Sequence, residues 1–242
     1  MRVLIISDIH ANLSALDAVR FDSGPVDAVW CLGDLVGYGP DPNQCIERIA
    51  ELPGLVCQLG NHDAAVLGLV PVEEFNLNAR LSIRWSSSVL TAACSAFLQT
   101  LTQMTTVGEV TLCHGSPRNP VWEYILDPRT AAASLDYFET PYCFVGHSHL
   151  PVCCTSLDKS KPVHLSMIRN SQAVQLIPRT IINPGSVGQP RDKDPRAAYA
   201  IYYTEEHRWE PRRVNYDIHA VQERIYKAGL PPLHASRLAQ GT

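Results

Sequence analysis

The chain has 242 residues, of which 45% are hydrophobic, and it carries a formal net charge of -4 with an isoelectric point near 6.1. This acidity argues against a broad basic surface that would hold a nucleic-acid backbone. No run of about 18 apolar residues is present, so we expect no membrane-spanning helix. The length suits one α/β domain, which we place at residues 1–229.

The first 60 residues alternate in pattern between strand, helix, strand, helix and strand. Leu13, Leu16 and Val19 form one apolar stripe on the first helix. Asp41 and Pro42 are residue types that favour the N-cap and first position of the second helix. This order indicates a βαβαβ unit and therefore a parallel sheet.

Residues 64–106 are predicted to form a helical insertion beside the site. The longest helical pattern of the chain spans residues 78–101 and places Leu81, Trp85 and Val89 on one side. Such an insertion could form one wall of a cleft, or it could simply cover the sheet. The sequence leaves both alternatives open.

The pattern after His149 changes to short β runs without intervening helices, which favours antiparallel pairing in a second sheet packed on the first. These runs are 151–157, 163–168, 172–178, 197–204 and 207–214. A helix over 217–228 is predicted to close the fold. We expect residues 230–242 to be a loose tail.

The eight cysteines include no CxxC pair. Cys31, Cys57, Cys113 and Cys143 lie within strand-like runs, where a reduced cysteine packs as a small apolar residue. The apolar stretch at the amino terminus is too short for a signal peptide. We therefore expect reduced thiols and a cytoplasmic location.

Metal-capable side chains follow five of the strand-like runs. Because ligand sites in open α/β sheets gather outside the carboxyl ends of the strands, we expect these side chains to converge. Oxygen and imidazole ligands suit a pair of hard or borderline divalent cations, and two such ions about 4 Å apart are a common device for displacement at phosphorus. The residues are Asp8 and His10, Asp34, Asn61 and His62, His114, and His147 and His149.

Each of these motifs also has a purely structural interpretation. An aspartate after a strand, such as Asp8, is often a helix cap or part of a turn, and residues 60–63 could be a polar turn. Against that, Asp63 next to His62 has the form of an acid that orients a base, which would raise the pKa of the imidazole. His147 and His149 would face the same side of an extended segment, so one loop could supply a ligand to each of two metals.

In combination, the motifs DxH, GD, GNHD, a strand followed by HG, and GHxH resemble the calcineurin-like metallophosphoesterase superfamily. The longer strings SDIHANLSAL, LGDLVGYGPDPNQCI, HGSPRNPVWEYI and INPGSVGQPRDKDPRAAYAIY resemble its small bacterial and archaeal phosphodiesterase branch. The resemblance covers about residues 1–215. GHSH stands where GHTH is commoner, which exchanges one hydroxyl for another.

The resemblance implies a four-layer α/β/β/α sandwich with two mixed sheets flanked by helices. It also implies two divalent metal ions, and the ligand types suit manganese, iron, zinc or nickel. In the family pattern, Asp34 bridges both ions and His62 faces the substrate without binding metal. The first ion would be held by Asp8, His10 and His149, and the second by Asn61, His114 and His147.

We therefore expect a metal-dependent hydrolase of small phosphodiesters, with monoesters left open. A hydroxide bridging the metals would attack phosphorus, while His62, oriented by Asp63, would stabilise the transition state or protonate the leaving oxygen. We take Asn61, Ser116, Arg118 and Arg191 as candidate substrate contacts. The last three could equally be ordinary polar residues of surface loops.

Three other classes share this fold. Phosphoprotein phosphatases carry a motif of the form GDxxDRG after the second strand, whereas this chain has GDLVGYGP at that place. Nucleases of the superfamily carry an added DNA-binding domain and a basic surface. A non-catalytic interaction scaffold would lack metal ligands, and here none is missing. We expect a small phosphate ester as partner, with no nucleic acid and no membrane, and the sequence leaves a homo-oligomer open.

Overall fold

The amino-terminal strand lies near the middle of the first of two mixed, six-stranded sheets. The computed structural model describes residues 1–156, 162–168 and 172–242. β1 (Arg2–Ile6) pairs in parallel with β2 (Ala28–Cys31) and antiparallel with β11 (Ala197–Tyr203). The order is β3-β2-β1-β11-β12-β9, with β3 at Val56–Cys57, β9 at Val174–Gln175 and β12 at Arg208–Val214.

The second sheet has the order β4-β5-β6-β10-β7-β8. β6 is parallel to both of its neighbours, β5 and β10, whereas β7 is antiparallel to β10. The strands are β4 (Met104–Val107), β5 (Val110–Cys113), β6 (Tyr142–Phe144), β7 (Pro151–Thr155), β8 (His164–Met167) and β10 (Thr180–Pro184).

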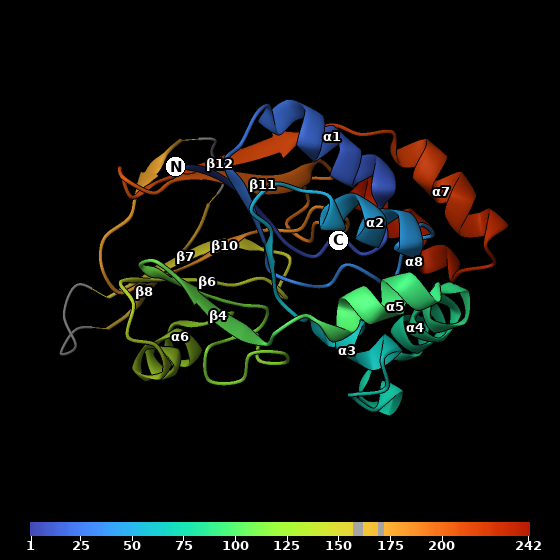
Figure 1. Cartoon of the computed structure of the whole chain (residues 1–242), viewed down its shortest axis with the longest axis horizontal. Helices are drawn as coiled ribbons and strands as arrows, with labels where there is room; N and C mark the ends of the chain where they lie inside the picture. The colour runs from blue at the N-terminus through green and yellow to red at the C-terminus, as the bar shows by residue number, and fades with distance from the viewer. Residues whose placement is uncertain (157–161, 169–171) are drawn as a thin grey trace.

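Apolar side chains between the two sheets form a central core. The Phe144 ring of the second sheet packs against Trp30 and Tyr202 of the first, with centroid distances of 6.2 and 5.0 Å. α1 (Leu13–Ser23) and α2 (Pro42–Ala50) cover the outer face of the first sheet, and α6 (Pro128–Ser134), followed by a 3-10 turn at Leu135–Tyr137, covers that of the second (Figure 1). The predicted four-layer α/β/β/α sandwich is confirmed.

The later strands do not form a sheet of their own, so that part of the prediction is wrong. β11, β12 and β9 extend the first sheet. β7, β8 and β10 lie in the second sheet together with β4, β5 and β6. β10 was not among the predicted runs, and residue 157, the last of the run 151–157, lies outside the described residues. Apolar alternation indicates that a segment is a strand, but long-range contacts decide which sheet edge it joins.

The helical insertion begins within α3 (Asn61–Val66). It then contains a 3-10 turn at Val72–Glu74 and two further helices where one was predicted over 78–101. α4 (Leu77–Val89) ends because Leu90 is extended, with ψ of 131°, and the Thr91 hydroxyl then caps α5 (Ala92–Gln99) by accepting from the Cys94 N–H. A threonine inside an apolar helical pattern can therefore be a cap that starts a new helix.

The carboxyl-terminal segment is folded rather than loose. α7 (Ile218–Lys227) is followed by α8 (Pro232–Gln240), and the two helices bury a shared apolar cluster that includes Val221, Ile225 and Leu238. The expected tail at 230–242 was wrong because its apolar positions at helical spacing have α7 to pack against.

α7 also holds the start of α2. The carboxylate of Asp41 caps no backbone N–H of α2, although Pro42 does open that helix as predicted. Asp41 instead accepts from the Arg224 guanidinium of α7, with Nη2 at 3.0 Å.

No helix among the described residues is long and apolar enough to cross a membrane, and all eight cysteines are free thiols.

Candidate metal centre

The polar motifs follow β1, β2, β3, β5 and β6 and meet at one end of the sandwich. They lie in loops, except for Asn61 and His62, which begin α3. The loops bind one another through their backbones: the Asp8 N–H donates to Gly33, and the His10 N–H donates to Asp34, at 3.0 and 2.9 Å. Five of the predicted ligands have left-handed backbone conformations with φ between 48° and 66°, namely Asp8, His10, Asp34, His147 and His149. Such strain costs about 1–3 kcal/mol per residue and clusters at functional sites.

The glycines of the GNHD and GHSH motifs allow these loops to approach closely. A Cβ atom on Gly60 would overlap the carboxylate and backbone nitrogen of Asp34. A Cβ atom on Gly146 would overlap the hydroxyl of Ser7. Both glycines are therefore required by close packing around the candidate ligands.

Three predicted ligands, Asp8, His10 and His149, form what we call the enclosed cluster. His10 Nε2 lies 3.0 Å from His149 Nε2, and His149 Nε2 lies 3.4 Å from Asp8 Oδ1. All three side chains are at most 2% exposed. The other ring nitrogens are held by the backbone: His10 Nδ1 donates to the Val36 carbonyl at 3.0 Å, and His149 Nδ1 to the Gln189 carbonyl at 2.6 Å.

The open cluster consists of Asn61, His114 and His147. His114 Nε2 lies 3.2 Å from Asn61 Oδ1 and 3.1 Å from His147 Nδ1. Again the remaining nitrogens donate to carbonyl oxygens, His114 Nδ1 to Leu32 at 2.8 Å and His147 Nε2 to Trp122 at 3.1 Å. Asn61 and His147 line a cavity of about 190 Å³, so this cluster faces the space that a substrate could enter.

Asp34 lies between the two clusters. Its Oδ2 atom is 3.5 Å from His10 Nε2 and 3.4 Å from His114 Nε2, while its Oδ1 atom accepts from the His62 N–H at 2.9 Å. Burial alone would raise the pKa of Asp34, but the neighbouring His114 and His62 imidazoles hold it well below its usual range. One oxygen is thus fixed by the backbone, and the other is available to both clusters.

The donor set fits metal cations. Since the Nδ1 atoms of His10 and His149 donate to carbonyls, their Nε2 atoms present lone pairs to each other at 3.0 Å. Burial lowers the pKa of both imidazoles well below the usual range, so a proton does not relieve this contact near neutral pH. Imidazoles oriented through their second nitrogen are the usual form of metal-binding histidines. A cation between them would convert the repulsion into ligation.

His62 lies beside the centre, but Asp63 does not orient it as predicted. The Asp63 carboxylate accepts backbone N–H groups from Asp34, Leu35, Val36 and Gly60, at 2.8 to 3.2 Å. His62 Nδ1 has no hydrogen-bond partner among the described residues. Consecutive residues of a helical turn point in different directions, and Asp63 turns back to cap α3. Asp63 therefore organises the loop after β2, and burial lowers the pKa of His62 to about 4 instead of raising it.

The candidate substrate contacts separate into two pairs. Asn61 and Arg191 line the 190 Å³ cavity together with His62. Ser116 and Arg118 instead bind Glu123, with Ser116 Oγ and Arg118 Nε at 2.6 and 3.0 Å from its Oε2 atom. Neither Ser116 nor Arg118 lines the cavity.

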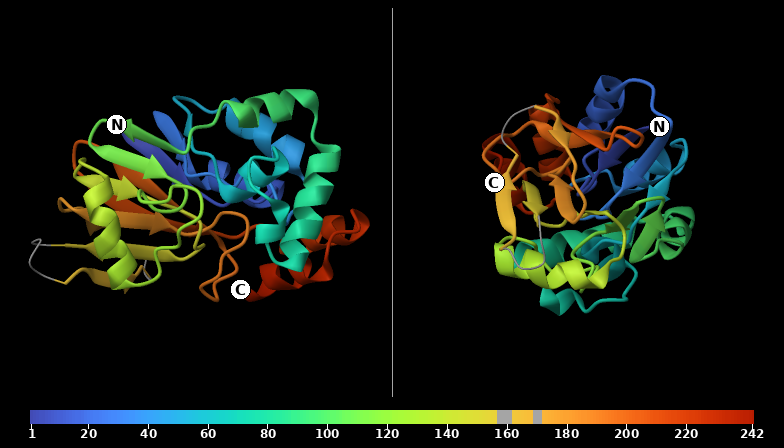
Figure 2. Two further views of the ribbon diagram at one scale, coloured as in Figure 1. Left: turned by 90° about the horizontal axis from the view of Figure 1, so that it is seen from below. Right: turned by 90° about the vertical axis from the view of Figure 1, so that its left-hand side faces the viewer.

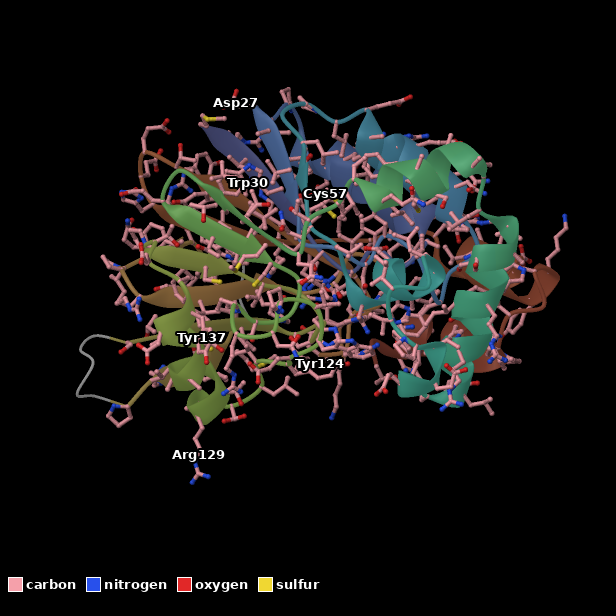
Figure 3. All side chains as sticks on the ribbon, turned by 60° about the horizontal axis from the view of Figure 1, so that its bottom comes forward. Asp27, Trp30, Cys57, Tyr124, Arg129 and Tyr137 are labelled. Atoms are coloured by element: carbon pink, nitrogen blue, oxygen red, sulfur yellow. The ribbon has the colours of Figure 1, made fainter. Side chains whose placement is uncertain are left out.

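Aromatic side chains form much of the cavity wall, although none of them was among the predicted site residues. Tyr124 stacks on His147 with a centroid distance of 3.8 Å and an interplanar angle of 13°. Figure 3 shows Tyr124 at the border between the second sheet and the helical insertion. Tyr38, Phe75 and Trp122 complete the wall. Tyr38 lies within the string GDLVGYGP, and Trp122 and Tyr124 lie within HGSPRNPVWEYI. Their place in these strings was the one sequence signal that could have identified them.

Residues 1–207 match the model of the calcineurin-like phosphoesterase superfamily domain. The chain is 35% identical over 246 aligned residues to the Methanocaldococcus jannaschii protein called uncharacterized protein MJ0912, covering 99% of this chain and 98% of that one. The crystal structure of a metallophosphoesterase from Sphaerobacter thermophilus has a TM-score of 0.92 and 44% identity, and covers 100% of this chain and 99% of that chain. A symmetrical bis(5'-nucleosyl)-tetraphosphatase of Pseudomonas syringae is 38% identical over 80 residues, which are 31% of this chain and 26% of that protein.

Proposed function

The chain belongs to the calcineurin-like phosphoesterase superfamily, and from that premise we propose that it is a dinuclear metal-dependent hydrolase of small phosphodiesters. The observation that carries the proposal is the position of one carboxylate oxygen. Asp34 Oδ2 lies within 3.5 Å of a histidine nitrogen from each cluster. Three further ligands on each side would complete two metal sites: Asp8, His10 and His149 in one, and Asn61, His114 and His147 in the other.

Two divalent ions bound there would supply an activated water molecule and would neutralise charge at phosphorus. The chain's own residues orient and bind the ester. His62 is a neutral imidazole that lines the cavity, so it can donate an N–H hydrogen bond to the leaving oxygen. Arg191 carries a fixed positive charge at the same cavity and can hold a phosphate oxygen.

The cavity favours a compact substrate. Glu74, Phe75 and Asn76, from the helical insertion, line it on one side, which supports the interpretation of the insertion as a wall. The rim therefore includes an acidic residue, and the whole chain has a net charge of -4. Long polyanions are bound through many lysine and arginine contacts, which this surface does not favour.

The proposal is tested by activity of the protein loaded separately with manganese, iron, zinc or nickel. The substrates are a bis-aryl phosphodiester, an aryl monoester, cyclic nucleotides, a phosphoserine peptide, duplex DNA and a dinucleoside tetraphosphate. The last is included because of the similarity to the Pseudomonas enzyme. We expect the highest kcat/KM for a small diester. A preference for the phosphoserine peptide or for DNA would contradict small phosphodiesters as the substrate class. Inactivity of every metal form would favour a non-catalytic scaffold.

The proposal includes a cytoplasmic location, where buried thiols such as Cys31 and Cys143 stay reduced. It requires neither a nucleic-acid partner nor a membrane. It holds for a monomer and for a homo-oligomer alike.

A further inference from the structure

The carboxyl-terminal helices lie beside the enclosed cluster, although they fall outside the part of the chain that matches the family model. α7 and α8 pack together at the same end of the molecule as the helical insertion (Figures 1 and 2). Between these helices and the metal centre is a small cavity of about 10 Å³. Its lining includes His10, Tyr38, Gln189 and His234.

Two buried polar atoms belong to residues that line this cavity and have no hydrogen-bond partner among the described residues. They are His234 Nδ1 and Gln189 Nε2. The opposite end of each side chain is already bound: His234 Nε2 donates to the Asn78 carbonyl at 3.1 Å, and Gln189 Oε1 accepts from Arg191 Nη2 at 3.0 Å. His234 therefore offers an acceptor and Gln189 offers a donor.

A single water molecule would satisfy both atoms. A cavity needs about 10–15 Å³ of this measure to hold one water, and a buried water needs at least two polar partners. This cavity meets both conditions, with Gln189 Nε2 donating to the water and the water donating to His234 Nδ1. Without such a partner, both buried groups would lose their hydrogen bonds to water on folding, which is destabilising.

We propose that one buried water molecule links His234 to Gln189, and that His234 is thereby a positioning residue for Arg191. The backbone carbonyl of Gln189 also accepts a hydrogen bond from His149 Nδ1. Gln189 therefore contacts both a ligand of the enclosed cluster and the Arg191 guanidinium at the larger cavity. Arg191 lies over the Tyr38 ring at 5.8 Å, and the same ring packs 4.8 Å from His234. The role assigned to Arg191 rests on the proposed function.

A high-resolution crystal structure tests the water directly. We expect one ordered water within hydrogen-bond distance of both His234 Nδ1 and Gln189 Nε2. In His234→Phe the water should be absent and the Arg191 guanidinium displaced. A dry cavity in the wild-type protein, or an unmoved Arg191 in the variant, would overturn the inference.

Binding of inorganic phosphate to the metal-loaded protein tests the positioning role. His234→Phe should weaken phosphate binding about fivefold, as expected for the loss of one hydrogen bond, with unchanged metal content. His234→Gln keeps an acceptor and a donor and should restore most of the affinity. In a diester assay, His234→Phe should raise KM with little change in kcat, and His234→Gln should bring KM back towards the wild-type value.

A matched control separates positioning from general destabilisation. Leu230→Ala removes packing from the same apolar cluster without touching the cavity, and should lower the unfolding temperature while leaving phosphate affinity unchanged. In an Arg191→Ala background, His234→Phe should have no further effect on phosphate binding. A full additive effect there, or no phosphate binding by the wild type, would overturn the positioning role. If the protein binds phosphate but hydrolyses no ester, the proposed function fails while this network stands.

Discussion

The enclosed and open clusters place similar ligands around one aspartate but differ in their surroundings. In both, imidazoles are locked by backbone carbonyls, and ring nitrogens face each other at 3.0 to 3.1 Å. His10 of the enclosed cluster borders the small cavity under the carboxyl-terminal helices. The larger cavity is lined by Asn61 and His147 of the open cluster and by His149 alone of the enclosed cluster. Two of the three ligands in the open cluster face the larger cavity, against one in the enclosed cluster, so we expect an ion in the open cluster to be the more accessible to substrate.

Asp34→Asn should have the largest effect, because it removes a carboxylate charge whose Oδ2 atom lies within 3.5 Å of an imidazole nitrogen in each cluster. We expect both ions to be lost or weakened together. Turnover should fall by at least about 10⁴-fold, since a bound divalent metal lowers the pKa of water to about 7. Elemental analysis alongside kinetics checks this. Retention of one full ion per chain would show that the clusters are independent.

His62→Ala tests a residue that neither cluster requires as a ligand. We expect turnover to fall about 10²- to 10⁴-fold with both ions retained, because the role we propose for the imidazole is to assist the leaving oxygen. The loss should be larger for an alkyl leaving group than for an aryl one, which needs little assistance. Equal losses on both substrates would argue against this role, and loss of metal would make His62 a ligand.

Tyr124→Ala should affect only the open cluster. The ring covers His147 and is itself 43% exposed, so its removal opens that ligand to solvent. We expect about a tenfold loss of affinity for one ion, in the range found when residues supporting a metal ligand are removed. Competition with a chelator measures both affinities, and Leu126→Ala, an exposed residue of the same loop, is the control. Equal weakening of both ions would contradict the distinction between the clusters.

His234→Gln should change the acid stability of the region behind the enclosed cluster. Burial lowers the pKa of His234 to about 4 in the folded protein, against about 6.5 when unfolded. Between these values the unfolded state binds the extra proton, so the folded protein loses stability as the pH falls from 6.5 to 4. Glutamine does not titrate there.

We therefore expect the acid-induced loss of unfolding free energy to be smaller in the variant, on the order of 1–3 kcal/mol. Denaturant unfolding at pH 7 and pH 5 measures the difference. His219→Gln, at an exposed position of α7, serves as the control and should show no such change. An identical pH dependence in wild type and His234→Gln would mean that His234 is not kept neutral by burial.

The strand ends and their polar motifs could be predicted from the sequence because each is a local pattern. Asp8, Asp34 and His114 follow apolar runs, and parallel strands bring their ends together. The division of the late strands between two sheets could not be predicted, because it depends on the long-range antiparallel pairing of β11 with β1. Side-chain direction was also invisible: Asp63 turns to the backbone, although it is adjacent to His62.

The cavity wall was harder to foresee than the metal ligands for a different reason. Metal ligands come from a few residue types, whereas Phe75 and Tyr124 look like ordinary core or surface residues until the fold brings them together. Ser116 and Arg118 show the converse error, since their types suit phosphate but Glu123 binds both. Chemical type predicts a possible contact, and only the fold shows which side chains are free to make it.

The most direct test of the central claim is the crystal structure of the metal-loaded protein, with the ions located by anomalous scattering. We expect two peaks about 4 Å apart. Asp34 Oδ2 should lie between them, with the enclosed cluster around one ion and the open cluster around the other. A single peak, or two ions that share no oxygen of Asp34, would contradict it.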